Sequence, residues 1–307
     1  MPAGRDPRSD IPVVWSRGPG CRELAALLTG NAVQVDGDPV RSCVRTRALL
    51  YVARRVTGFD ACSTAVPSHF DPDGVREVAA FVGRGPHSPL AAAVALRIAH
   101  RLGVPARGVY AHAEPGPVPP AGRVLPEISE RFPSLPIDAV PAAEPADLVG
   151  SLPAGCLFVL GAPGGSWLQR RFFGPGAKIL HRAPAGTVVV KQAPRRVYQV
   201  MDDPEAYGTE LRVADAVALG LRDVVVAVGG RPVGVVDSAA LGPDSARRTL
   251  GELARPVPFV DPLETVDEAS ELFADAAVDV LPVVAQGRFL GVFRRAALED
   301  PALPWAG

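Results

Sequence analysis

Two stretches in the second half of the chain repeat each other and decide its organisation. Residues 213–241 read VADAVALGLRDVVVAVGGRPVGVVDSAAL, and residues 266–298 read VDEASELFADAAVDVLPVVAQGRFLGVFRRAAL. Each stretch predicts an amphipathic helix, an apolar strand, a turn that contains glycine, a second strand and a final helix that ends in Ala-Ala-Leu. Because one such unit cannot bury its apolar face alone, we expect the two copies to pack together as one pseudo-symmetric domain.

Length and composition indicate a folded protein of about two domains. The chain has 307 residues, of which 48% are hydrophobic and 21% are charged, and this excludes disorder as its main state. It contains no run of about 18 apolar residues, the length that a membrane helix requires. The N-terminal stretch MPAGRDPRSD lacks the apolar core of a secretory signal. We therefore expect a cytoplasmic protein without a membrane partner.

The charge is distributed unevenly between the two parts of the chain. The net charge of −1 argues against nucleic acid as a partner. Residues 1–195 carry 22 Lys and Arg against 15 Asp and Glu, whereas residues 196–307 carry 10 against 18. This difference predicts a boundary near residue 195, with an anion bound more readily before it than after it.

Catalytic and metal-binding patterns are missing from the sequence. The four cysteines, Cys21, Cys43, Cys62 and Cys156, have no C-x-x-C spacing, and we expect buried reduced thiols. The five histidines have no ligand spacing, and no P-loop or nucleophile elbow is present. The sequence predicts a protein that is not an enzyme and has no metal cofactor.

Three blocks follow from the pattern of proline, glycine and apolar runs. Residues 1–76 form an N-terminal α/β segment of unassigned role, with a helix expected at 22–28, a strand at 32–35 and a helix at 43–56. Residues 77–193 alternate strands and helices, which predicts a doubly wound parallel sheet with helices on both faces. The ranges expected there are strands at 78–82, 108–113, 137–140, 156–160 and 187–191, and helices at 90–102, 127–132, 146–152 and 176–181. Residues 194–307 hold the repeat, with copies at about 196–243 and 249–301.

The middle block resembles the universal stress protein family over about residues 77–192. The resemblance is carried by VGRGPHS at 82–88 and by the pattern G-x-x-G-x9-G, which starts at Gly161 and ends at Gly174, followed by the strand that ends at Lys191. It implies an adenine nucleotide site, formed by Val82, Gly83, Arg84, Gly161, Gly164, Gly165, Gly174 and Gly176.

The glycine pattern has a physical reason. Gly161 and Gly164 let the backbone approach a phosphate with N–H groups directed inward, and Gly174 precedes a helix N-terminus. The chain departs from the family at two positions. Pro175 replaces a serine or threonine after the third glycine, and Gly83 replaces an aspartate at the end of the first strand. Both changes remove contacts that a nucleotide would use.

The repeat resembles a tandem pair of CBS (cystathionine-β-synthase) domains over about residues 196–300. The resemblance rests on LPVV at 281–284, GRFLGVF at 287–293 and their counterparts VVVAV at 224–228 and GRPVGVV at 230–236. It implies a regulatory module that binds ATP or AMP in the clefts between repeats. The cleft residues implied are Asp237, Arg294, Pro282 and Val283.

Four positions modify this expectation for the clefts. Ala240 and Ala297 stand where the family has an acid that accepts hydrogen bonds from ribose. Asp237 occupies the hydroxyl position of the first copy and would repel a phosphate, whereas Arg294 occupies it in the second copy and would attract one. If either cleft binds an anion, we expect the cleft beside Arg294.

The resemblances together favour a stress-associated regulatory protein that senses an adenine nucleotide. We expect this protein to form a homodimer and to contact a protein partner still to be identified. Two other hypotheses remain open. In the first, both halves have lost their ligands and the chain is an interaction scaffold that dimerises through its sheet edge and CBS helices. In the second, the chain hydrolyses ATP slowly.

Overall fold

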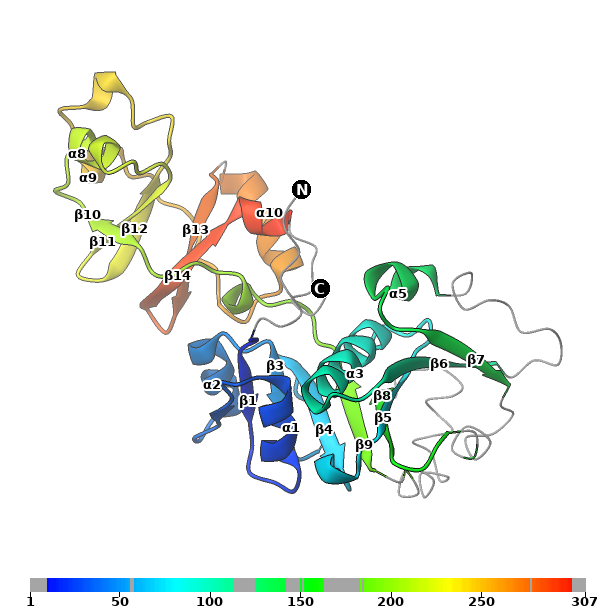
Figure 1. The fold of residues 1–307 in the computed structure, drawn as a ribbon. Helices are drawn as coiled ribbons and strands as arrows, with labels where there is room; N and C mark the ends of the chain where they lie inside the picture. The colour runs from blue at the N-terminus through cyan, green and yellow to red at the C-terminus, as the bar shows by residue number, and fades with distance from the viewer. Residues whose placement is uncertain are drawn as a thin grey trace. The chain divides into compact units, whose positions relative to one another are not determined.

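The structure is a computed structural model, which describes residues 10–55, 58–112, 125–141, 150, 152–162, 183, 185–276 and 278–299 (Figure 1). The chain divides into two compact units, with the boundary between Ala193 and Pro194. Unit 1 precedes this boundary and unit 2 follows it. The sequence predicted a boundary near residue 195 from the change in charge.

Unit 1 contains a nine-stranded sheet with the order β2-β1-β3-β4-β9-β8-β5-β6-β7. Strands β1 to β4 are parallel to one another, strands β5 to β9 are also parallel to one another, and the two sets meet at the antiparallel pair β4–β9. The strands are β1 (Val13–Trp15), β2 (Val33–Gln34), β3 (Leu50–Val52), β4 (Ser63–Ser68), β5 (Glu77–Phe81), β6 (Ala106–His112), β7 (Ile137–Pro141), β8 (Cys156–Gly161) and β9 (Thr187–Lys191).

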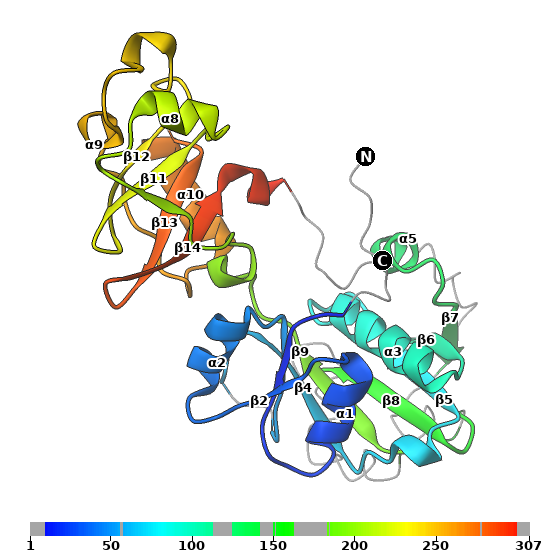
Figure 2. The same cartoon turned by 60° about the vertical axis from the view of Figure 1, so that its left-hand side comes forward.

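Three of the described helices of unit 1 cover one face of this sheet. The described helices are α1 (Cys21–Leu28), α2 (Pro39–Thr46), α3 (Ser88–Leu102) and α5 (Pro126–Arg131). Helices α1, α3 and α5 share one hydrophobic cluster with the strands beneath them, and Figure 2 shows α1 and α3 in front of the same face. Strand β5 alternates between two clusters, because Val78 and Ala80 face these helices whereas Ala79 and Phe81 face the opposite side.

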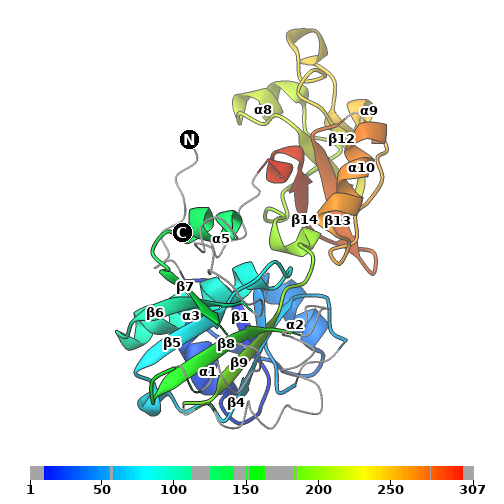
Figure 3. The same ribbon diagram turned by 90° about the vertical axis from the view of Figure 1, so that its right-hand side faces the viewer.

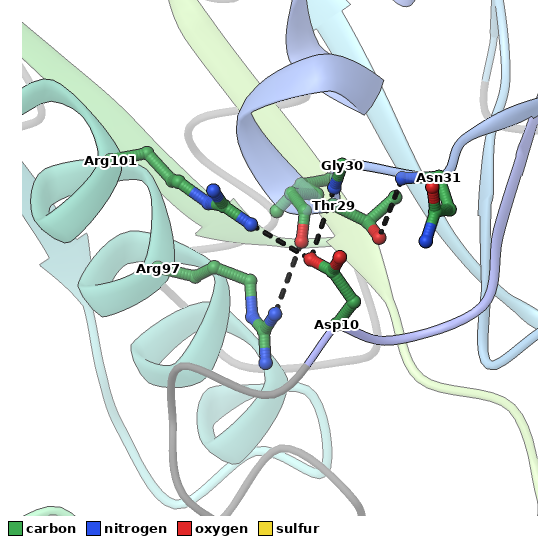
Figure 4. A network of polar contacts seen from close by, with 7 residues as sticks. Asp10, Thr29, Gly30, Asn31, Arg97 and Arg101 are labelled. Atoms are coloured by element: carbon green, nitrogen blue, oxygen red, sulfur yellow. Dashed lines mark hydrogen bonds and ion pairs between the residues drawn. The ribbon is translucent and has the colours of Figure 1, made fainter.

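A polar network fixes the start of the described chain to helices α1 and α3 (Figure 4). The carboxylate of Asp10 accepts hydrogen bonds from Gly30 N at 3.0 Å and from the Arg101 guanidinium at 2.8 Å. These contacts, the Gly30 N–H first, lower the pKa of Asp10. Arg97 donates to the carbonyl of Leu28 at 3.1 Å and thereby satisfies an acceptor at the C-terminal end of α1.

Unit 2 holds two β-hairpins that have the same order of elements. The first has a three-stranded sheet, β10-β11-β12 (Figure 1), and the second has the antiparallel pair β13–β14 (Figure 3). The elements are β10 (Ala206–Gly208), α8 (Val213–Ala218), β11 (Val224–Val228), β12 (Arg231–Val236), α9 (Leu250–Leu253), α10 (Val266–Ala276), β13 (Val280–Ala285) and β14 (Arg288–Arg294), with 3-10 turns at Val197–Gln199, Pro243–Ser245 and Arg295–Leu298.

The sequence was wrong about three helices. Residues 43–56 do not form one helix, because α2 ends at Thr46, Arg47 has a left-handed backbone, and β3 follows. The final helix of each copy is a 3-10 turn at Arg295–Leu298 in the second copy and only turns in the first. The helices expected at 146–152 and 176–181 fall on ranges that lie almost entirely outside the described residues.

Candidate functional site

Two of the residues predicted to hold a nucleotide in unit 1, Val82 and Gly161, lie at one edge of the sheet. Phe81 at the end of β5 pairs with Leu160 near the end of β8, so Val82 and Gly161 lie at neighbouring strand ends. The neighbours of β5 are β6 on one side and β8 on the other, so the strand order reverses here. In open α/β sheets, ligands bind at such a switch point. Gly164, Gly165, Gly174 and Gly176 lie outside the described residues.

The turn after β5 is held by its own backbone and by the first residue of α3. Val82 is buried and its N–H donates to the carbonyl of Val109, whereas the N–H of Gly83 donates to Ser88 Oγ at 2.9 Å. Arg84, another residue of the predicted nucleotide site, is exposed. A Cβ built on Gly83 meets no atom within 4 Å, so close packing does not explain the glycine there.

His87 joins this turn to the end of β9, which the sequence did not indicate. Its Nδ1 accepts a hydrogen bond from Gln192 N at 3.1 Å, and the side chain is 8% exposed. Burial, together with the nearby charge of Lys191, lowers the pKa of His87. The imidazole is therefore neutral near pH 7 and acts as a structural acceptor.

Unit 2 contains a cavity of about 320 Å³ that Arg294 lines. Its wall combines apolar strand residues with a phenol, two arginines and two carboxylates. The lining residues are Glu205, Tyr207, Gly220, Leu221, Arg222, Asp223, Val224, Val225, Val292 and Arg294. Both repeats contribute, because β14 carries Val292 and Arg294 whereas the other lining residues belong to the first copy.

Arg294 is held by a carboxylate. Its Nε donates to Asp202 Oδ2 at 2.7 Å, and both side chains are partly exposed. The backbones of Asp202 and Val292 also exchange hydrogen bonds, of 2.8 and 3.3 Å. Gly291 permits this approach, since a Cβ there would lie 2.4 Å from the carbonyl oxygen of Asp202.

The first copy repeats this arrangement with the charges exchanged. Arg255 and Val235 exchange two backbone hydrogen bonds of 2.9 Å, and a Cβ on Gly234 would lie 2.5 Å from the Arg255 carbonyl. The Asp237 carboxylate accepts a short hydrogen bond from the Arg255 guanidinium and a second from Ala240 N. Asp237 therefore occupies the position that Arg294 has in the second copy.

The other predicted cleft residues do not join Arg294. Pro282 and Val283 lie in β13, where they pair with Val292 and Gly291, and both are buried. Neither they nor Asp237 line the Arg294 cavity. Tyr207, Glu205, Arg222 and Asp223 line it instead, and the repeat pattern gave no signal for them because they lie outside its apolar strands.

The cavity contains acidic groups despite the alanine at position 297. Glu205 Oε1 accepts a hydrogen bond of 2.6 Å from the Tyr207 hydroxyl, which raises the pKa of Tyr207. Asp223 Oδ1 accepts from Ser238 N at 3.1 Å. Both carboxylates keep further acceptor capacity, so the cavity offers acceptors for hydroxyl groups as well as cations for an anion.

The described part of the chain contains no group of three or more His, Cys, Asp or Glu side chains placed to bind a metal. Its four cysteines are free and buried. Among the same residues, no helix is both long enough and apolar enough to cross a membrane.

A comparison with protein families matches residues 250–298 to the family described as CBS domain. Residues 250–298 form a CBS domain. This stretch includes α10, the hairpin β13–β14 and Arg294, whereas the match does not extend over the first copy. The match also does not cover residues 77–192, which resemble universal stress proteins.

The chain is similar to several solved structures, of which some are described as CBS domains. One is an acetoin utilization protein (AcuB) from Vibrio cholerae, with 19% identity over 34% of this chain and 87% of that one, and a TM-score of 0.30. CBSX2 in complex with AMP has 22% identity over 36% and 96% of the two chains, and a TM-score of 0.31. The CBS domain of a bacterial CNNM/CorC family Mg²⁺ transporter in complex with ATP has 19% identity over 34% and 85%, and a TM-score of 0.32. No curated protein matches the chain.

Proposed function

We propose that residues 194–299 form a regulatory CBS pair and that the cavity lined by Arg294 binds an adenine nucleotide. The observation that carries this proposal is the composition of the cavity wall. Val224, Val225 and Val292 offer an apolar surface to a base, while Arg222 and Arg294 offer positive charge to a phosphate. A base and a phosphate are the two chemically different ends of a nucleotide.

The sugar has partners in this arrangement too. Ala297 cannot accept hydrogen bonds from ribose, but the carboxylates of Glu205 and Asp223 lie in the same wall. They come from the first copy, so a nucleotide would contact both repeats. A ligand that bridges two repeats biases their arrangement, which is how binding would become a regulatory signal.

Asp202 would compete with a bound phosphate for the guanidinium of Arg294. A phosphate that binds Arg294 must share its guanidinium with the Asp202 carboxylate or displace it. Asp202 follows the 3-10 turn Val197–Gln199 at the start of unit 2. Ligand binding would therefore loosen the segment that leaves the boundary between the units.

Calorimetric titration of the full chain with AMP, ADP, ATP and S-adenosylmethionine tests this function. The proposal expects saturable heat with at least one of the three adenine nucleotides and a higher melting temperature in its presence. A full chain that shows neither with any of the three would refute it and favour the interaction scaffold.

Unit 1 supplies a second candidate site. The switch point between β5 and β8 places Val82, Gly83 and Gly161 at one edge, and the sequence adds the glycines at 164 and 174. We propose nucleotide binding there as in universal stress proteins. In a chain that carries Arg294→Ala, residual ATP binding should disappear on adding Gly164→Trp; unchanged residual affinity would exclude the site.

The wider role remains a proposal. We infer a cytoplasmic, stress-associated regulator without catalytic activity that forms a homodimer. Slow ATP hydrolysis would appear as phosphate release above background that is lost in Gly164→Trp, and such a result would replace the non-enzymatic assignment.

A further inference from the structure

The sheet of unit 1 contains two sets of strands in matching register. One row of paired residues runs across the first set as Val33, Val14, Tyr51 and Thr64. An equivalent row runs across the second set as Val109, Phe81, Leu160 and Val189. Strands β2, β1, β3 and β4 therefore correspond in order and register to β6, β5, β8 and β9.

The helices after the first strand of each set match at a constant shift of 67 residues along the sequence. Arg17-Gly18-Pro19 precedes α1 and Arg84-Gly85-Pro86 precedes α3. Cys21 N donates to Gly18 O at 3.2 Å, as Ser88 N does to Gly85 O. The second bond of each helix start, between Leu24 N and Gly20 O in α1, has the same counterpart in α3.

The buried positions of α1 correspond to buried positions of α3 at the same shift of 67 residues. The four buried positions of α1 are Cys21, Leu24, Ala25 and Leu28. Their counterparts Ser88, Ala91, Ala92 and Ala95 are all buried in α3. Both helices belong to one hydrophobic cluster and so cover one face of the sheet. Agreement in turn sequence, hydrogen bonding and burial at a single shift is what two copies of one structural unit would show.

The two copies are related by a pseudo-two-fold axis normal to the sheet. Strands are parallel within each copy and antiparallel between copies, while the helices remain on the same face. The axis passes close to the pair Ala65–Val190. Both carbonyls accept equivalent hydrogen bonds, from Ala53 N at 2.9 Å and from Ala162 N at 2.6 Å.

We propose that residues 10–68 are a shortened copy of residues 77–191 and that this copy occupies, in cis, the place of a second chain along β9. Without β4, the apolar strand Thr187–Lys191 would be an open edge available to another molecule. The N-terminal segment thus makes unit 1 an internal dimer, and this edge is not available for association between chains.

The first copy has no counterpart of the connection that carries the glycine pattern. Only residues 53–62 connect β3 to β4, whereas residues 162–186 connect β8 to β9 and include Gly164 and Gly174. The first copy therefore supplies the pairing surface, and unit 1 has at most one glycine-loop site for a phosphate.

A disulfide between the paired strands tests the arrangement in the full chain. Ser68 and Thr187 lie opposite each other in the β4–β9 ladder, and their separation as direct antiparallel partners suits a disulfide. Ser68→Cys/Thr187→Cys should form an intramolecular disulfide under mild oxidation, detected by peptide mass spectrometry and by monomer mobility on a non-reducing gel.

The two single variants control for linkage to the native cysteines, which are buried. A disulfide-linked species of twice the chain mass in the double variant would show that β4 and β9 meet between chains. Two thiols that stay reduced under the same oxidation would show that the strands are not partners. Either result would overturn the proposal.

Discussion

The guanidinium Nε of Arg294 lies 2.7 Å from Asp202 Oδ2, and the equivalent position of the first copy has the opposite charge order, with Asp237 bound to Arg255. The backbone bridges around the two pairs are the same, so the difference lies in the side chains. A phosphate entering the Arg294 position gains an attractive charge, whereas at the Asp237 position it would meet a carboxylate. We therefore expect an anion to bind beside Arg294 and not beside Asp237.

Removing the competing carboxylate should strengthen nucleotide binding. Asp202→Asn keeps the size of the side chain but frees the charge of Arg294. Because exposed ion pairs contribute about 0–1 kcal/mol, AMP affinity should rise by up to about fivefold. Titration calorimetry measures the change, and Asp237→Asn provides the matched control in the other copy, with no expected change. Equal effects of both variants would contradict the one-sided account.

Gly291 should be required for the fold of the second copy. In Gly291→Ala the new methyl group would lie 2.4 Å from the Asp202 carbonyl oxygen, so the backbone bridge must move apart. Overpacking of this kind costs about 1–3 kcal/mol, and the melting temperature should fall by several degrees.

Gly83→Ala is the control for this experiment, because its added methyl group meets no atom within 4 Å. Its melting temperature should stay close to that of the unmodified chain. A Gly291→Ala protein as stable as Gly83→Ala would mean that the close approach at Asp202 is not present.

The buried His87 should make stability depend on pH. Its pKa is lowered in the folded protein by burial and by Lys191, so the unfolded chain takes up a proton first as the pH falls through about 6.5. Stability should be complete above this pH and decrease below it. His87→Gln keeps an acceptor for Gln192 N and should flatten the profile of melting temperature between pH 7 and 5.

His100 gives the matched comparison, since it is an exposed histidine in α3, the helix that His87 directly precedes. His100→Gln should leave the pH profile as steep as in the unmodified chain. A melting-temperature profile that flattens in His100→Gln but not in His87→Gln would contradict the assignment of the pH dependence to His87.

The alternation of apolar strand segments with helical segments allowed much of the fold to be predicted from the sequence. The expected strands at 78–82 and 156–160 correspond to β5 and β8, because a strand buried between two layers is apolar along its whole length. Strand β4 was not expected, since Ser63–Ser68 contains serine, threonine and proline. Its position is determined by pairing with β9, a contact between residues far apart in the sequence.

The surroundings of Arg294 could be predicted only in part. Arg294 itself was proposed from the sequence, because its position in the repeat is fixed by sequence alone. Tyr207 and Arg222 were not found, because the packing of one copy against the other brings them beside Arg294. The ion pairs of Arg294 and Asp237 also depend on backbone bridges that no local pattern specifies.

Titration of AMP and ATP into the full-length Arg294→Ala variant tests the central claim most directly. Loss of a hydrogen bond to a charged phosphate costs about 1.5–3 kcal/mol, so affinity should fall by about tenfold or more. Arg288→Ala removes an exposed arginine from the other end of β14 and should change the affinity by less than about twofold. Unchanged affinity in Arg294→Ala, or an equal loss in both variants, would contradict a nucleotide site beside Arg294.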